Sequence, residues 1–191
     1  MSNNPSIKID FLYLDLSVCT RCQDTGDSIE ESLNSVSEIL KQTGVEVVLN
    51  PVHIQTPEQA VEYQFVSSPT IRINGQDIQM EVKESHCDTC SSLTTGASVD
   101  CRDWEYQGKT YSAPPKAMIM DAVLRSVYGN ESGSKLTANT AKNKQSEAYS
   151  LPENLQGYFE NKDQLCAQVE TPKVDDCGCD RSTCCTDYAG A

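Results

Sequence analysis

Hydrophobic and polar positions alternate at the start of the chain and then merge into an apolar run. Odd positions carry Ile7, Ile9, Phe11 and Tyr13, whereas even positions become apolar only from Leu12. Because successive side chains of a strand point to opposite faces, this pattern predicts a strand whose second half is buried on both faces. Such a strand lies inside a sheet rather than at its edge.

Helical periodicity follows this strand. Over residues 28–42, apolar side chains recur three or four positions apart, as on one face of a helix: Ile29, Leu33, Val36 and Leu40. Gly44 stands where a helix commonly ends. Residues 45–49 are rich in valine and predict a second, short strand.

Three local motifs predict the elements that come next. Thr56-Pro57-Glu58-Gln59 is a capping box that opens a helix extending to about Phe65. Two alternating runs over 67–82 flank Asn74-Gly75, which is typical of a tight β-hairpin. Pro114-Pro115 opens a last helix that Gly129 ends, with an expected buried stripe of Met120, Val123, Leu124 and Val127.

The order of these elements predicts an α/β domain over residues 6–129. Residues 83–113 stand before its last helix as an insertion that contains three cysteines. Residues 130–150 are small and polar, which predicts a flexible linker. Residues 151–191 form a cysteine-rich tail that begins with an apolar island at 151–159, expected to form one or two helical turns.

Composition narrows the class of protein. The 191 residues carry a net charge of −13, and no basic patch stands out, which argues against a nucleic-acid partner. The chain shows neither a secretory leader pattern nor a long apolar run, so we expect no membrane partner and a cytoplasmic location. Its ten cysteines then indicate metal or redox chemistry rather than a disulfide framework.

The first cysteine pair, Cys19-Thr20-Arg21-Cys22, directly follows the predicted first strand. In a redox interpretation, Cys19 is the nucleophile and Cys22 resolves the mixed disulfide, while Arg21 favours the Cys19 thiolate. The alternatives are a soft metal or metalloid site and an inert structural pair.

The order of elements, this Cys-x-x-Cys pair and Ser68-Pro69-Thr70 before the hairpin resemble the thioredoxin-like superfamily. The resemblance covers about residues 6–129 and implies that Pro69 is cis and faces the cysteine pair. More narrowly, the chain resembles a thioredoxin-like family encoded near arsenic-resistance genes, with a Cys-Cys near the C-terminus. That resemblance implies a metalloid or thiol-stress context.

The chain departs from the superfamily beside the motif. The aromatic and Gly-Pro surroundings of the usual motif are absent, and Gly26 separates the cysteine pair from the helical stripe. Glycine inside a helix costs about 1 kcal/mol relative to alanine. Either the helix begins at Cys19 and tolerates Gly26, or it begins near Ser28 and the pair lies on a loop.

The insertion holds a second motif, in which Cys87 and Cys90 form a C-x2-C knuckle and Cys101 follows. Such a knuckle turns two sulfurs toward one side, as tetrahedral zinc requires. His86, Cys166 or a tail cysteine would complete the zinc site. A disulfide and a set of free or transfer thiols are the alternatives.

The tail carries a third group, with C-x-C and C-C spacing: Cys177, Cys179, Cys184 and Cys185. These spacings make strained disulfides and suit soft ions such as trivalent arsenic or mercury. We expect either a relay that passes electrons or a metalloid to the first pair, or a scavenging tail.

Two functions follow from these motifs. The first is a thiol–disulfide oxidoreductase in which Cys19, Cys22 and Pro69 are the site and protein thiols or disulfides are the partners. The alternative is a protein that binds and transfers zinc, arsenic or mercury without turnover.

Overall fold

The protein contains two β-sheets, one of four strands and one of three. The computed structural model describes residues 6–95, 97–129 and 149–168, with side chains as far as residue 162. The fold is mixed α/β, as the sequence predicts. Its elements are β1 (Ser6–Tyr13), α1 (Thr20–Gln42), β2 (Glu46–His53), α2 (Pro57–Glu62), β3 (Thr70–Ile73), β4 (Gln76–Asp77), β5 (Lys83–His86), α3 (Asp88–Ser91), β6 (Asp100–Tyr106), β7 (Lys109–Tyr111), α4 (Lys116–Tyr128) and α5 (Glu153–Gln168).

The larger sheet has the strand order β2-β1-β3-β4. β1 runs parallel to β2 and antiparallel to β3, so it pairs on both sides. This confirms the prediction that the first strand lies inside the sheet. The neighbouring hairpin turns at Asn74 and Gly75, whose φ angles are 51° and 82°, as a tight turn of this type requires.

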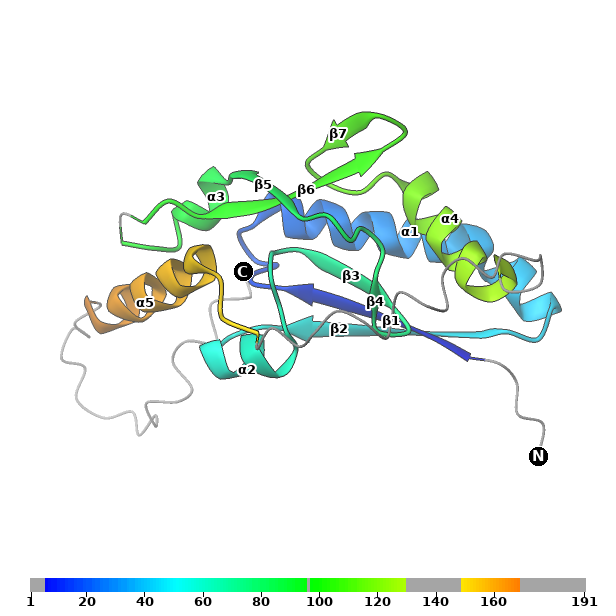
Figure 1. The fold of residues 1–191 in the computed structure, drawn as a ribbon, viewed down its shortest axis with the longest axis horizontal. Helices are drawn as coiled ribbons and strands as arrows, with labels where there is room; N and C mark the ends of the chain where they lie inside the picture. The colour runs from blue at the N-terminus through cyan, green and yellow to red at the C-terminus, as the bar shows by residue number, and fades with distance from the viewer. Residues whose placement is uncertain (1–5, 96, 130–148, 169–191) are drawn as a thin grey trace, which may run out of the picture.

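Helices α1 and α4 cover one face of this sheet (Figure 1). Every second residue at the start of β1 points to this face, and these residues are apolar. The buried side chains of this layer are Ile7, Ile9, Phe11, Ile71 and Ile73 from the sheet, Ile29, Val36 and Leu40 from α1, and Met118, Ile119 and Val123 from α4. Of the stripe expected on α4, only Val123 is fully buried, because the helix turns Met118 and Ile119 inward instead.

Helix α1 begins at Thr20, with Cys19 as its N-cap residue. It therefore runs through Gly26, and the cysteine pair lies on the first turn rather than on a loop. A Cβ atom at Gly26 would stand 3.6 Å from the Phe11 ring, which is an ordinary van der Waals distance, so α1 packs over β1 here without a steric need for glycine. Packing against the sheet offsets the low helix propensity of this glycine.

Residues 83–113 form a substructure of their own, in which β5, β6 and β7 make a three-stranded sheet and α3 follows β5. Arg102 of β6 ties this unit to the larger sheet. Its buried guanidinium binds the Asp77 carboxylate at 2.8 and 2.9 Å and stacks 4.7 Å from the centre of the Trp104 ring. The insertion is thus packed onto the domain and not a loop that extends from it.

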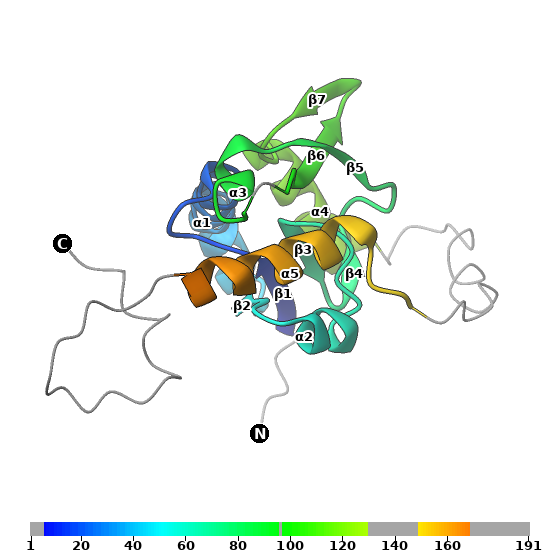
Figure 2. The ribbon, with the colours of Figure 1, turned by 90° about the vertical axis from the view of Figure 1, so that its left-hand side faces the viewer.

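Helix α5 is longer than the one or two turns expected for the apolar island, and it lies across the end of the larger sheet beside α2 (Figure 2). Leu155, Tyr158 and Phe159 are its buried side chains. The predicted linker falls almost entirely, at residues 130–148, outside the described residues, and so do the tail cysteines at 177–185. Among the described residues, no helix is both long enough and apolar enough to cross a membrane.

Candidate metal centre

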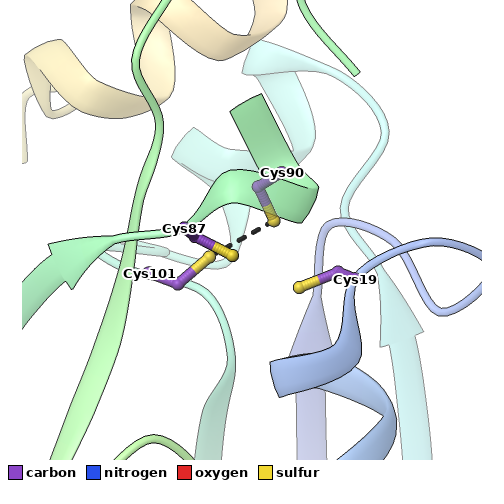
Figure 3. A group of neighbouring side chains, drawn as sticks. All are labelled: Cys19, Cys87, Cys90 and Cys101. Atoms are coloured by element: carbon purple, nitrogen blue, oxygen red, sulfur yellow. Dashed lines mark hydrogen bonds between the residues drawn. The ribbon is translucent and has the colours of Figure 1, made fainter. Parts of the chain in front are cut away.

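Four cysteines that are far apart in the sequence meet at one end of the larger sheet. The sulfur atoms of Cys19, Cys87, Cys90 and Cys101 all lie within 4.8 Å of one another, and they point toward a common space (Figure 3). Cys90 Sγ and Cys101 Sγ are 3.2 Å apart. Cys87 is 4% exposed and the other three are fully buried. We call these residues the four-cysteine group.

Cys19 reaches the group from the N-terminus of α1, at the end of the connection that follows β1. The backbone NH of Val18 donates a hydrogen bond to the Asp15 carboxylate at 2.7 Å, and Gln23 donates to the carbonyl of Leu16 at 2.7 Å. These bonds fix the short connection between β1 and α1. The Cys19 sulfur makes no capping bond to the helix, so it is free to turn toward the other cysteines.

Cys87 and Cys90 flank the start of α3, the single turn that follows β5. The NH of Cys87 donates to the carbonyl of Val99 at 2.9 Å, and the Ser91 hydroxyl donates to the Cys87 carbonyl at 2.8 Å. Cys101 stands on β6, directly after the residues that close this turn. The knuckle predicted from the C-x2-C spacing is therefore present, and β6 brings the third sulfur to it.

Arg21 connects the two halves of the site. Its guanidinium donates hydrogen bonds to the carbonyls of Cys101 and His86, at 3.2 and 3.1 Å, and to the carboxylate of Asp103 at 2.8 Å. One side chain on the first turn of α1 thus holds both β5 and β6. The expectation that Arg21 also favours the Cys19 thiolate by its charge stays a prediction.

Cys22 stands outside the four-cysteine group. Its sulfur lies 3.4 Å from the hydroxyl oxygen of Ser68, and that oxygen also accepts a hydrogen bond from the NH of Leu14 at 3.2 Å. The Ser68–Pro69 peptide bond is cis, as the thioredoxin-like resemblance implies for Pro69. The carbonyl of Ser68 accepts a hydrogen bond from the NH of Arg102 at 2.7 Å. The backbone beside Pro69 is therefore already hydrogen-bonded to the insertion.

Helix α5 covers the cysteines. Leu155, Tyr158 and Phe159 belong to the same buried cluster as Cys19 and Cys90. The Tyr158 hydroxyl is buried without a hydrogen-bond partner among the described residues, and burial raises the pKa of its phenol. The site is thus closed from solvent by an element that sequence analysis assigned to the tail.

A side-chain amide attaches α5 next to the site. Asn154 accepts a hydrogen bond from the NH of Asp100 at 3.0 Å and donates one to its carbonyl at 2.8 Å. Asp100 directly precedes Cys101. The position of α5 is therefore coupled to β6, the strand that carries Cys101.

The crowded sulfurs shift one another's ionisation. Hydrogen bonds from Cys101 first, and then from the other thiols, lower the pKa of Cys19, and the hydrogen bond with Cys101 is the main cause that lowers the pKa of Cys87 to about 6. Hydrogen bonding with Cys19 and burial raise the pKa of Cys101. The pKa of Cys90 rises as well, because its neighbours and burial outweigh the lowering contribution of Cys101. The group therefore holds two sulfurs that favour the thiolate beside two that keep their protons.

His86 and Cys166, the other ligands considered for the insertion, are placed differently. The ring nitrogens of His86 contact the Ser98 hydroxyl at 2.9 Å and the Asp88 carboxylate at 3.1 Å, and the residue is not a member of the four-cysteine group. Cys166 lies on α5, but its side chain is outside the described part of the chain.

Sequence reasoning treated the first pair and the insertion as separate sites and so did not place Cys19 beside Cys87, Cys90 and Cys101. One signal was available, since three sulfurs of the insertion needed a fourth ligand. The hydrogen bonds from Arg21 to the insertion and the position of α5 left no comparable signal, because both depend on contacts between residues far apart in the sequence.

Comparison with known proteins gives a family and no function. Neither the curated proteins nor the solved structures contain a match to this chain. One family model matches residues 7–123, which run from β1 into α4 and include all four members of the four-cysteine group. That is more than half of the sequence, so the chain belongs to the family described as domain of unknown function (DUF2703).

Proposed function

We propose that this protein binds one thiophilic metal ion, Zn²⁺ in the first place, through the thiolates of Cys19, Cys87, Cys90 and Cys101. The observation that carries the proposal is the convergence of four buried sulfurs within 4.8 Å of one another. They come from the start of α1, from both sides of the α3 start and from β6. Four thiolates are a common ligand set of closed zinc sites.

The spacing of the sulfurs supports a single ion. A tetrahedral ion with bonds of about 2.3 Å holds its sulfurs about 3.8 Å apart. The largest separation among the four sulfurs is at most 4.8 Å and the Cys90–Cys101 separation is 3.2 Å, so the two distances lie on either side of that value. Sulfurs that bind different irons of an iron–sulfur cluster stand further apart, because irons and sulfides lie between them.

Charge gives a second argument. Thiols that touch in an apolar interior cannot all ionise, because each thiolate repels the next at low effective dielectric. A divalent cation removes most of that repulsion and allows the four sulfurs to remain this close. The surroundings that would hold such a centre are already built from α3, α5 and the Arg21 guanidinium.

We also propose that the larger sheet with its helices is a thioredoxin-like domain. The sheet order β2-β1-β3-β4, the parallel β1 and β2, the antiparallel β3 and β4, and the cis bond before Pro69 support this. The arsenic context implied by the narrower resemblance stays a prediction.

The thiol–disulfide oxidoreductase is the second candidate, and the Cys-x-x-Cys on the first turn of α1 favours it. Attack on a protein disulfide needs an accessible sulfur, however, and both Cys19 and Cys22 are fully buried. The backbone beside Pro69 is also paired with β6. The geometry therefore supports metal binding better than exchange with a protein partner.

Metal analysis of matched cysteine variants tests the proposal. The background is the full chain with Cys177, Cys179, Cys184 and Cys185 changed to serine, so that tail thiols add no metal. After anaerobic purification we expect about one zinc per chain in this background and in Cys22→Ser, but far less in Cys101→Ser. Equal metal content in Cys22→Ser and Cys101→Ser, or no metal in the background, would overturn the proposal.

A further inference from the structure

Cys22 is a buried thiol that a four-ligand metal site does not use. Its side chain is fully buried and its sulfur lies beside the Ser68 hydroxyl at 3.4 Å. Among the cysteines whose side chains are described, it is the one outside the four-cysteine group.

Cys22 stands one helical turn after Cys19, on the first turn of α1. Residues three positions apart on a helix are neighbours, with Cβ atoms about 5–6 Å apart, so the two cysteines occupy adjacent positions on one face of the helix. Cys19 thus faces two kinds of partner, three metal-ligating cysteines and one free thiol. A sulfur that binds a metal as thiolate cannot at the same time be half of a disulfide.

We infer that Cys19 and Cys22 form a disulfide in response to a small peroxide, and that this reaction releases the metal. The inference rests on the proposed metal site. It assigns Cys22 a function as the resolving thiol of an oxidant-sensitive site. The oxidant has to be a small molecule, because Leu155, Tyr158 and Phe159 of α5 cover the sulfurs.

The reaction balances with hydrogen peroxide as the oxidant. The Cys19 thiolate attacks one peroxide oxygen, the O–O bond breaks, and hydroxide leaves and takes up a proton to become water. Cys19 is then a sulfenic acid. Cys22 Sγ attacks the Cys19 sulfur, the S–O bond breaks, and the second water leaves with the Cys22 proton. Two electrons pass from the two sulfurs to the peroxide, and the metal loses one of its four ligands.

Cys90 and Cys101 are the competing pair, with sulfurs only 3.2 Å apart. A disulfide between them would remove two ligands at once, because both belong to the metal site. The Cys19–Cys22 disulfide breaks only one metal–sulfur bond, since Cys22 is not a ligand. The Cys22 sulfur contacts the Ser68 hydroxyl, which itself accepts a hydrogen bond from the NH of Leu14.

The test treats zinc-loaded protein with hydrogen peroxide, in the full chain with the four tail cysteines changed to serine. Metal content is measured before and after treatment and again after dithiothreitol and fresh zinc. Peptide mass spectrometry maps the oxidised residues. We expect release of zinc, a disulfide between Cys19 and Cys22, and recovery of nearly all the metal after reduction.

Cys22→Ser is the deciding variant, because it leaves the four ligands in place. Before peroxide it should hold as much zinc as its parent, and loss of metal at that stage in both proteins would count against the metal site itself. After peroxide its Cys19 should proceed to sulfinic acid, so that dithiothreitol restores less than about a tenth of the metal. Full recovery in Cys22→Ser, or a parent disulfide mapped to Cys90 and Cys101, would overturn the inference.

Discussion

The guanidinium of Arg21 donates a hydrogen bond to the backbone carbonyl of Cys101, with 3.2 Å between Nη1 and the oxygen. The same side chain binds the carbonyl of His86, the residue before Cys87. Arg21 lies on the helical turn that starts at Cys19. The Arg21 side chain thus sets the distance between Cys19 and the two strands β5 and β6, which bring the other sulfurs.

We expect Arg21→Ala to weaken metal binding by about tenfold to a hundredfold, as is common when groups that orient metal ligands are lost. Arg21→Lys should recover only part of this loss, because lysine lacks the planar fork that reaches several oxygens. Competition with a chelator of known affinity measures both changes.

Arg125→Ala is the matched control for Arg21. Arg125 is exposed on α4 and pairs with Asp121 one turn before it. We expect its loss to change stability by less than about 0.5 kcal/mol and to leave metal affinity unchanged. Equal metal affinity in Arg21→Ala and Arg125→Ala would contradict the role given to Arg21.

Metal removal should destabilise the protein. A ligand that binds only the folded state stabilises it by about 4 kcal/mol when its free concentration is a thousand times its dissociation constant. Addition of a strong chelator should therefore lower the thermal midpoint of the wild-type protein. Cys101→Ser should unfold at one temperature with or without chelator, and a midpoint that responds equally in both proteins would speak against binding at this site.

Metal binding should release about two protons near neutral pH rather than about four, because Cys19 and Cys87 already favour the thiolate. Cys90 and Cys101, whose pKa values are raised, supply these protons. Affinity should then fall as the pH falls, and more steeply below about 6, where Cys87 also becomes protonated. Calorimetric titrations in buffers of different ionisation enthalpy count the protons, and release of about four at neutral pH would contradict the shifted pKa values.

The attachment of α5 should control how fast the metal leaves. Asn154→Ala removes two hydrogen bonds to Asp100 and an exposed one to the Glu84 carboxylate. Because the two bonds to Asp100 contribute about 1 kcal/mol each, we expect metal transfer to a chromophoric chelator to accelerate roughly thirtyfold. The amount of metal bound should not change.

Gln156→Ala is the control for Asn154, since among the described residues the Gln156 side chain bonds only to the carbonyl of Leu151, at the entry to α5 itself. Its transfer rate should match wild type. Identical rates in Asn154→Ala and Gln156→Ala would show that α5 does not limit exchange.

Local signals in the sequence predicted much of the framework. The hydroxyl of Thr56 accepts a hydrogen bond from the NH of Gln59, as the capping box requires, and the tight turn at Asn74 and Gly75 is present. These features depend on residues a few positions apart, so propensity and spacing reveal them. Gly26 conflicts with helix propensity, so the sequence allows two starts for α1, and the tertiary structure places the start at Thr20.

The four-cysteine group depends instead on contacts between distant residues. Cys19 and Cys101 meet because β6 pairs with the backbone at Ser68, and no short motif records that pairing. Likewise, α5 follows a long polar segment, so its apolar residues gave no indication of which surface they cover. Residue types and spacing could nominate cysteines as ligands, but the choice of Cys19 over His86 required the tertiary structure.

X-ray absorption at the zinc edge is the most direct test of the central claim, applied to the full chain with the four tail cysteines changed to serine. The four-cysteine group predicts four sulfur neighbours at about 2.3 Å and no nitrogen or oxygen ligand. The same spectrum in Cys22→Ser would agree with its place outside the site. A histidine nitrogen or a water oxygen in the first coordination sphere, or fewer than four sulfurs, would contradict the assignment of Cys19, Cys87, Cys90 and Cys101 as the ligands.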